Sequence, residues 1–181
     1  MINEKAITKA VKELAKSERL FTERIGDMVY ICNAYCAVYL HNVLYSELVR
    51  PVSALFLDLE DGEGTRKDFN DKLSAKTDSP MRISEIIRNA KSDISVSDTE
   101  FKKIIKGKKC ANVLLANDKM IMVDEKLLEM CRAFNDSAVL SESTDSKHIG
   151  NAPVVSVSDK NIGYMVLPLR RDSDFYRVTI A

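Results

Sequence analysis

The chain has 181 residues, 45% of them hydrophobic and 30% charged, and its formal net charge at pH 7 is zero. This composition is typical of a globular protein and excludes a disordered chain or a polycation that coats nucleic acid. No apolar run approaches the roughly 18 residues of a membrane-spanning helix, and charges interrupt the N-terminal segment, so no secretory signal is expected. The four cysteines are therefore expected to be free thiols in a reducing cytoplasm.

Residues 2–16 are predicted to form a helix, with Asn3 as its cap. Its apolar residues recur three or four positions apart, which places them on one face: Ala6, Ile7, Ala10, Val11 and Leu14. The other side carries a row of lysines: Lys5, Lys9, Lys12 and Lys16. Two interpretations of this row stay open. It is either a solvated surface, or a contact with nucleic-acid phosphates that relieves the repulsion between the ammonium groups.

Two β-rich runs, 28–32 and 36–40, predict a hairpin whose loop is Asn33–Tyr35, because asparagine tolerates left-handed backbone angles. This hairpin would place Cys32 and Cys36 opposite each other, with His41 following. Further along the chain we expect a helix over 43–49 that ends at Pro51, and then a strand over 52–59. A long polar loop over 60–80 and a helix over 83–91 come next.

After the polar segment 92–109, which ends in a run of lysines, the hairpin pattern returns. Residues 113–117 parallel 29–33, and a helix over 125–134, capped by Asp124, parallels the helix over 43–49. Residues 120–123 form the return strand. The separation falls from 84 residues (Val29 to Val113) to 82 (Arg50 to Arg132). The pattern predicts an internal duplication, with chance similarity of two generic units as the alternative. Further strands are expected at 138–143, 154–157, 163–169 and 175–180.

Two stretches of the chain resemble the bacterial DNA sliding clamp family, the β subunit of the replicative DNA polymerase. The segment YMVLPLR, residues 164–170, is similar to the YVVMPMR motif that closes domains of this family, with leucines in place of methionines. The segment MVYICNAYCAVYL, residues 28–40, is similar to the family's hairpin LRxVATDGHRLAV, with Asn33-Ala34-Tyr35 in place of Asp-Gly-His.

The resemblance implies an α+β fold of the DNA-clamp type, built from duplicated units of a helix and antiparallel strands. Helices would face the DNA and sheets would lie outside. The chain would be a single clamp-like domain, 1–181, with pseudo-repeats at about 1–75 and 92–170 and an extra strand within 171–181. The implied partner is duplex DNA, held by its backbone without base readout. The cations expected to contribute are Lys5, Lys9, Lys12, Lys16, Arg82, Arg88, Lys91, Lys126 and Arg132.

The resemblance also implies contacts with a polymerase or other replication proteins. In the family, the closing motif lines a hydrophobic pocket for short peptides. By position, the pocket residues here would be Met165, Leu167, Pro168, Leu169 and Arg170. Two departures matter. A closed ring in this family uses six domains, so this chain would have to form a hexameric ring, act as an open clamp-like piece, or serve another role on the same fold. A compact single-domain version would suit a phage or mobile element. The tail after Arg170 could also cover the pocket.

Other chemistry has weaker support in the sequence. The carboxylates of Asp58, Glu60, Asp61 and Glu63 could bind a divalent cation, but a solvated loop is favoured because no EF-hand register fits. Cys131 is expected in the core, and His148 in a polar loop. Nucleotide-binding, zinc-protease and hydrolase motifs are absent. We therefore expect no catalytic activity, cofactor or metal. The alternatives are a protein-interaction module without DNA binding and a metal-dependent enzyme without a recognisable motif.

Overall fold

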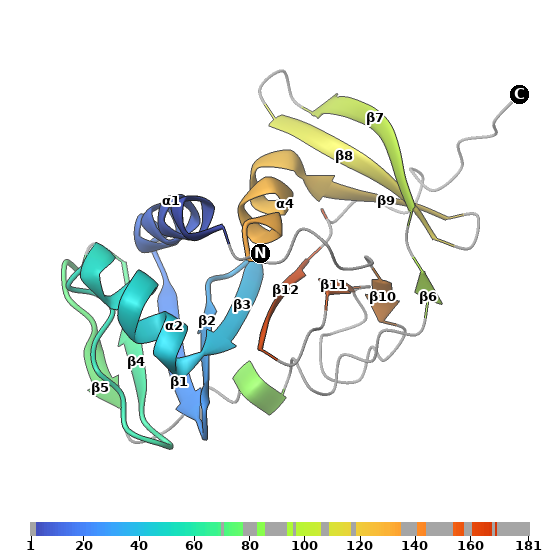
Figure 1. The fold of residues 1–181 in the computed structure, drawn as a ribbon. Coiled ribbons are helices and arrows are strands. Elements are labelled where there is room, and N and C mark those ends of the chain that lie inside the picture. Colours follow the sequence, from blue (N-terminus) through green and yellow to red (C-terminus); the bar gives the residue numbers. More distant parts are fainter. Residues whose placement is uncertain are drawn as a thin grey trace, which may run out of the picture.

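The structure is a computed structural model, and it describes residues 3–69, 71–77, 83–85, 94–95, 97–105, 109–116, 119–134, 141–143, 154–157, 161–167 and 169. Within these residues, antiparallel strands form one nine-stranded and one three-stranded sheet, and helices pack with them (Figure 1). This is the mixed helix and antiparallel-sheet arrangement that the sequence predicts. No helix in the described ranges is long and apolar enough to cross a membrane.

Helix α1 runs from Glu4 to Ala15 and begins at a side-chain cap. The Asn3 Oδ1 atom accepts a hydrogen bond from the Ala6 backbone N–H at 3.1 Å, which satisfies one of the free donors of the first turn. The apolar face is fully or almost fully buried: Ile7, Ala10, Val11 and Leu14. The predicted helix and its cap are therefore confirmed.

The large sheet has the strand order β5-β4-β1-β2-β3-β12-β11-β10-β6 within the described residues. Its strands are β1 (Leu20–Ile25), β2 (Met28–Cys32), β3 (Cys36–His41), β4 (Gly64–Lys67), β5 (Ala75–Thr77), β6 (Ile94–Ser95), β10 (Ser141–Ser143), β11 (Val154–Val157) and β12 (Ile162–Val166). Two segments far apart in the sequence meet at its centre, where β3 pairs with β12 and Leu40 lies opposite Ile162. The pairing buries both central strands on both faces.

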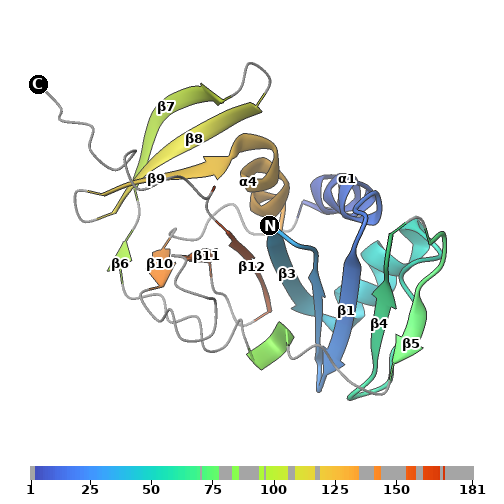
Figure 2. The same ribbon diagram turned by 180° about the vertical axis from the view of Figure 1, so that it is seen from behind.

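Alternation along the central strands divides their side chains between two cores. On one face, residues such as Val38 and Val166 pack with the helices in the main cluster. On the other face, Tyr39 and Met165 pack in a smaller cluster that includes Ile83. Helices α1 and α4 lie side by side over the first face (Figures 1 and 2).

The second sheet consists of β7 (Ser97–Ile105), β8 (Lys109–Ala116) and β9 (Lys119–Asp124), followed by helix α4 (Glu125–Arg132). Its β9 residues Ile121 and Val123 join the main core, so both sheets share one apolar interior. The Leu169 N–H donates to the Met122 carbonyl at 2.8 Å and connects the segment after β12 to this sheet. The predicted return hairpin and helix are confirmed.

The expected helix over 43–49 exists, but its geometry changes along its length. A short α-helical turn, α2 (Asn42–Leu44), passes into the π-helical turn η1 (Tyr45–Val49) and then the 3-10 turn η2 (Arg50–Val52). Pro51 lacks the backbone donor that a continuing helix needs, which fits the end of the helix here.

Several polar strands were not predicted. Strand β1 was missed, because its pattern is broken by Thr22 and Glu23, which are both buried. Strands β4 and β5 lie within the expected loop 60–80, and β7 lies within the expected polar segment. Strands rich in polar side chains have the composition of a loop and lack the apolar alternation by which strands are predicted.

The predicted strand over 52–59 is wrong. This segment is an irregular loop whose apolar side chains Leu55, Phe56 and Leu59 are buried in the main core. Two of its carbonyls accept side-chain hydrogen bonds instead of strand hydrogen bonds. Tyr45 Oη donates to Leu57 O at 2.8 Å, and an Arg24 guanidinium nitrogen donates to Leu59 O at 2.8 Å. These bonds satisfy the buried backbone without a neighbouring strand.

Of the expected helix over 83–91, the structure describes residues 83–85, which are helical. Of the expected strand over 138–143 it describes β10. The expected strand over 175–180 and the tail 171–181 lie outside the described residues.

Candidate nucleic-acid interface

The lysine row lies on the exposed side of α1. Lys5, Lys9 and Lys12 belong to the helix, and Lys16 follows at its C-cap; all four are exposed. Within the part of the chain that is described, Lys5, Lys9 and Lys12 have no ion-pair partner. From Lys5 to Lys16 the row spans roughly 16 Å, at the α-helical rise of about 1.5 Å per residue. It therefore forms an extended cationic stripe.

Glu13 interrupts this stripe and connects α1 to α4. Its carboxylate lies 2.8 Å from Lys126 Nζ on α4 and 2.5 Å from Lys16 Nζ. The hydrogen bonds from Lys126 and Lys16 lower the pKa of Glu13 to about 2. The contact with Lys126 could not be predicted from the sequence, since the two residues are far apart along the chain.

The predicted cations on α4 have partners of their own. Lys126 is exposed but pairs with Glu13. Arg132 is half-buried near Tyr164, whose pKa is raised mainly by burial. The helix is capped by Asp124, whose carboxylate accepts from the Leu127 N–H at 3.2 Å. The structure thus brings Lys126 beside the α1 row but turns Arg132 toward β12.

Arg82, Arg88 and Lys91 lie outside the described residues. Their predicted contribution to DNA contact stays a prediction.

A cation that was not predicted holds the end of α1. Lys67, on β4, is buried, and its Nζ atom donates to the carbonyls of Ala15 at 3.2 Å and Ser17 at 2.7 Å. A positive charge at a helix C-terminus satisfies free carbonyls and opposes the negative end of the helix dipole. Lys67 therefore fixes the point where the lysine row ends.

The predicted peptide pocket is partly described, and its first residue is covered. Met165 is 7% exposed and packs in the cluster that contains Ile83. The buried Glu23 carboxylate anchors the segment that contains Ile83, because it accepts from Ile83 N–H at 2.9 Å and from the Ser84 hydroxyl at 2.8 Å. In this arrangement the Met165 side chain is not accessible to a peptide.

The other residues of the closing motif are distributed differently. Leu167 and Leu169 are half-buried. The Leu167 N–H donates to the Tyr35 carbonyl at 2.9 Å, which ties the motif to the β2–β3 turn. Pro168 and Arg170 lie outside the described residues.

The expectation that Cys32 and Cys36 face each other is wrong. Cys32 lies opposite Ala37. The hydrogen bond next to the turn runs from the Asn33 N–H to the Cys36 carbonyl at 3.0 Å, so Cys36 pairs with Asn33 and not with Cys32. Alternation then puts Cys36 in the main core and Cys32 against the smaller cluster, on the other face. Burial raises the pKa of Cys32 to about 12.

Cys131 and His41 have packing and capping contacts. Cys131 on α4 is fully buried beside Cys36, and burial raises its pKa well above the usual value. His41 Nδ1 accepts from the Val43 N–H at 3.3 Å and caps α2. Among the described residues no group of three or more His, Cys, Asp or Glu side chains is placed to hold a metal. His148 lies outside these residues.

The acidic loop carboxylates have separate partners. Asp58 lies 3.3 Å from Arg50, and Glu63 lies 2.6 Å from Lys76. Asp61 accepts from the Gly26 backbone N–H at 2.6 Å. Gly26 lies in the turn between β1 and β2 and has a φ of +58°, a backbone conformation that favours glycine. The hydrogen bond to Asp61 holds this turn against the acidic loop. The contacts place three of the four carboxylates in different local structures.

Comparison with known proteins gives a weak structural likeness. No family model and no curated protein sequence matches the chain. Among solved structures, it is similar to the β subunit of DNA polymerase from Streptococcus pyogenes, with a TM-score of 0.35 and 10% sequence identity over 98% of this chain and 67% of that one. A likeness this weak establishes neither a family nor a function.

Proposed function

We propose that the chain is a non-catalytic, clamp-like protein that contacts the phosphate backbone of duplex DNA through the lysine row of α1. The observation that carries the proposal is the exposure of all four lysines on one helix, three of them without an ion-pair partner among the described residues. Like charges at this spacing repel, and a row of phosphates would remove that repulsion.

Two further features support the proposal. Helix α4 lies beside α1 over the same sheet face, so the row projects from a broad two-helix surface (Figure 1). The sequence motifs at 28–40 and 164–170 resemble the sliding clamp family, in which helices face the DNA. Because the contact is with phosphates, the binding would be independent of base sequence.

Charge reversal on α1 tests the proposal. Lys5, Lys9, Lys12 and Lys16 are changed to Glu, and the affinity for a labelled duplex is measured by fluorescence anisotropy at low salt. We expect the quadruple variant to lose measurable binding. The matched control sets Lys12→Glu against Lys72→Glu, because Lys72 is also exposed but lies outside the row. Both variants change the net charge equally, so only position differs. Unchanged duplex affinity in the quadruple variant contradicts the proposal.

The proposed clamp has two related units, at about 1–75 and 92–170. In support, each three-stranded meander, β1-β2-β3 and β7-β8-β9, is followed by a helix. The closing pair of the first hairpin, Asn33 and Cys36, lies 83 residues before that of the second, Ala116 and Lys119, and the caps His41 and Asp124 have the same separation. The constant separation at these three positions supports the proposed repeat without a gap.

We further propose assembly with other copies of the chain, and contact with replication proteins. Light scattering measures the assembly directly. Six copies would fit a closed ring, whereas a stable monomer would contradict a topological clamp.

A further inference from the structure

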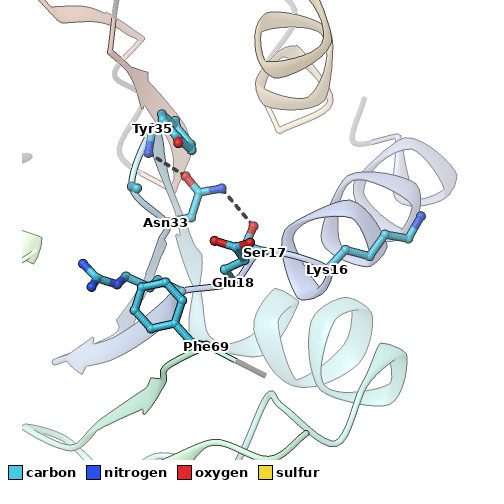
Figure 3. A pocket seen from close by; sticks show the side chains of 8 residues that line it. Lys16, Ser17, Glu18, Asn33, Tyr35 and Phe69 are labelled. Carbon is cyan, nitrogen blue, oxygen red and sulfur yellow. Dashed lines mark hydrogen bonds between the residues drawn. The ribbon is translucent and has the colours of Figure 1, made fainter. Parts of the chain in front are cut away.

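A cleft of about 610 Å³ lies beyond the end of α1 (Figure 3). The residues around it come from three separate segments: Lys16, Ser17, Glu18 and Arg19 after α1, Asn33, Ala34 and Tyr35 in the β2–β3 turn, and Phe69 after β4. Its volume is that of a typical small-molecule or nucleotide site. Lys16 belongs both to the lysine row and to the cleft wall, so the row leads directly into the cleft.

Two exposed aromatic rings border this cleft. Tyr35 is 63% exposed and Phe69 is 52% exposed. In Figure 3 they lie at opposite sides of the cleft, with Asn33, Ser17 and Glu18 between them. Burying a ring is strongly favourable, so two solvent-facing rings around one hollow indicate a surface that another molecule covers.

Tyr35 is held in place by its backbone. Its N–H donates to Asn33 Oδ1 at 2.8 Å, and its carbonyl accepts from the Leu167 N–H at 2.9 Å. Asn33 is itself fixed, since its Nδ2 atom donates to Ser17 Oγ at 3.1 Å and its Oδ1 atom also accepts from the Cys36 N–H at 2.9 Å. The ring therefore projects from a rigid turn, and a ligand that stacks on it has little ordering cost to overcome.

Phe69 is positioned by a cation. The Arg19 guanidinium carbon lies 4.5 Å from the centre of the Phe69 ring, in a cation–π contact. Arg19 and Lys16 are exposed, and the buried Lys67 lies directly behind Ser17, whereas Glu18 is the acidic residue of the cleft wall. The cleft wall thus combines solvent-facing rings with the cations Lys16 and Arg19 and the carboxylate of Glu18, and Lys16 also pairs with Glu13.

We propose that this cleft binds unpaired nucleotides of a single strand that adjoins the duplex held by α1. Single-stranded sites combine a cationic path for the phosphates with aromatic rings on which bases stack. A paired base hides its faces within the helical stack, so among nucleic acids an unpaired strand is the form that can stack on Tyr35 and Phe69. The position of the cleft at the end of the lysine row gives the strand a continuous route. The assignment of the adjoining duplex rests on the proposed function, but binding of a free single strand does not.

The test measures anisotropy with a labelled oligothymidylate of about 12 nucleotides, which lies within the usual site size. Tyr35→Ala and Phe69→Ala are each expected to weaken binding about tenfold, in line with the loss of one stacked base. Tyr35→Phe keeps the ring and should bind like the parent protein. Phe101→Ala removes a ring that is 74% exposed on β7, away from the cleft, and serves as the matched control.

The same variants are measured with a blunt duplex, which should bind them with unchanged affinity. Equal single-strand affinity in parent, Tyr35→Ala and Phe69→Ala proteins overturns the cleft assignment while leaving the α1 proposal standing. Equal losses for duplex and single strand also overturn it, because the rings would then not select unpaired bases. So does a cleft that takes an acidic, aromatic peptide but no oligothymidylate. If the parent protein binds the oligothymidylate but not the duplex, the proposed function is contradicted and the cleft assignment is not.

Discussion

Helices α1 and α4 lie side by side on the same core but present different charges to solvent. Both start at a side-chain cap, and both bury an apolar face: Ile7, Ala10, Val11 and Leu14 on α1, and Leu128 and Cys131 on α4. On α1, Lys5, Lys9 and Lys12 lack an ion-pair partner among the described residues. On α4, Lys126 and Arg132 are both engaged. Packing therefore explains why both helices exist, and only charge distinguishes the one that could bind an anion.

The largest expected effect tests whether the two helices are equal in packing. Leu14→Ala and Leu128→Ala each remove a side chain with no exposed surface. Each variant should lower the free energy of unfolding by about 2–5 kcal/mol, because a cavity remains in the core. Urea denaturation measures both. A loss below about 1 kcal/mol in one variant alone would show that its helix is packed less tightly than the structure indicates.

A second change tests how the C-terminal end of α1 is held in place. Lys67→Met keeps the length of the side chain but removes the two hydrogen bonds to the carbonyls of Ala15 and Ser17. The free energy of unfolding should fall by about 1–3 kcal/mol, as for hydrogen bonds from a charged donor. Lys72→Met, at an exposed position, is the control and should leave the urea midpoint unchanged. Equal midpoints for the two variants would mean that Lys67 does not hold α1.

The N-terminal caps offer a matched pair. Asn3→Ala and Asp124→Ala each remove an oxygen that accepts from a backbone N–H of the first turn, of Ala6 and Leu127 respectively. Each should cost about 1 kcal/mol. Circular dichroism during urea denaturation would report both losses, and the substitution of either cap by Ser should restore most of the stability. An absence of rescue by Ser would contradict the capping role.

The smallest effect concerns the contact between the helices. The pKa of Glu13 is lowered from 4.5 to about 2, so the unfolded state binds more protons between these pH values. The contribution of Glu13 is therefore complete above about pH 4.5 and is lost as the pH falls toward 2. The difference in stability between the parent protein and Glu13→Gln should shrink over this window. Because the ion pair is exposed, the effect should be small. A constant difference between pH 2 and 6 would contradict the assigned pKa.

Local signals made α1, the β2–β3 hairpin and α4 predictable. Asn3 and Asp124 mark helix starts, and the apolar residues that follow have helical spacing. Strand β1 was not predictable in the same way, because Glu23 and Thr22 interrupt its apolar pattern. They are buried only because distant residues pair with them: Thr65 with Thr22, and Ile83 and Ser84 with Glu23.

The candidate interface shows the same limit. The lysine row follows directly from sequence spacing, since it lies on one helix. The contacts of Lys126 with Glu13, Lys67 with Ala15, and Arg19 with Phe69 join separate segments, which spacing cannot reveal. A one-residue error in the hairpin register was enough to put Cys32 on the wrong face, because side chains alternate along a strand.

The salt dependence of duplex binding tests most directly whether α1 alone faces the phosphates. Each phosphate contact contributes about 0.9 to the slope of log affinity against log salt, so four lysines predict a slope of about −3 to −4. Lys9→Gln with Lys12→Gln should make that slope about two less steep, while Lys126→Gln on α4 should leave it unchanged. An equal change of slope for the two helices, or no change in the α1 variant, would contradict the account.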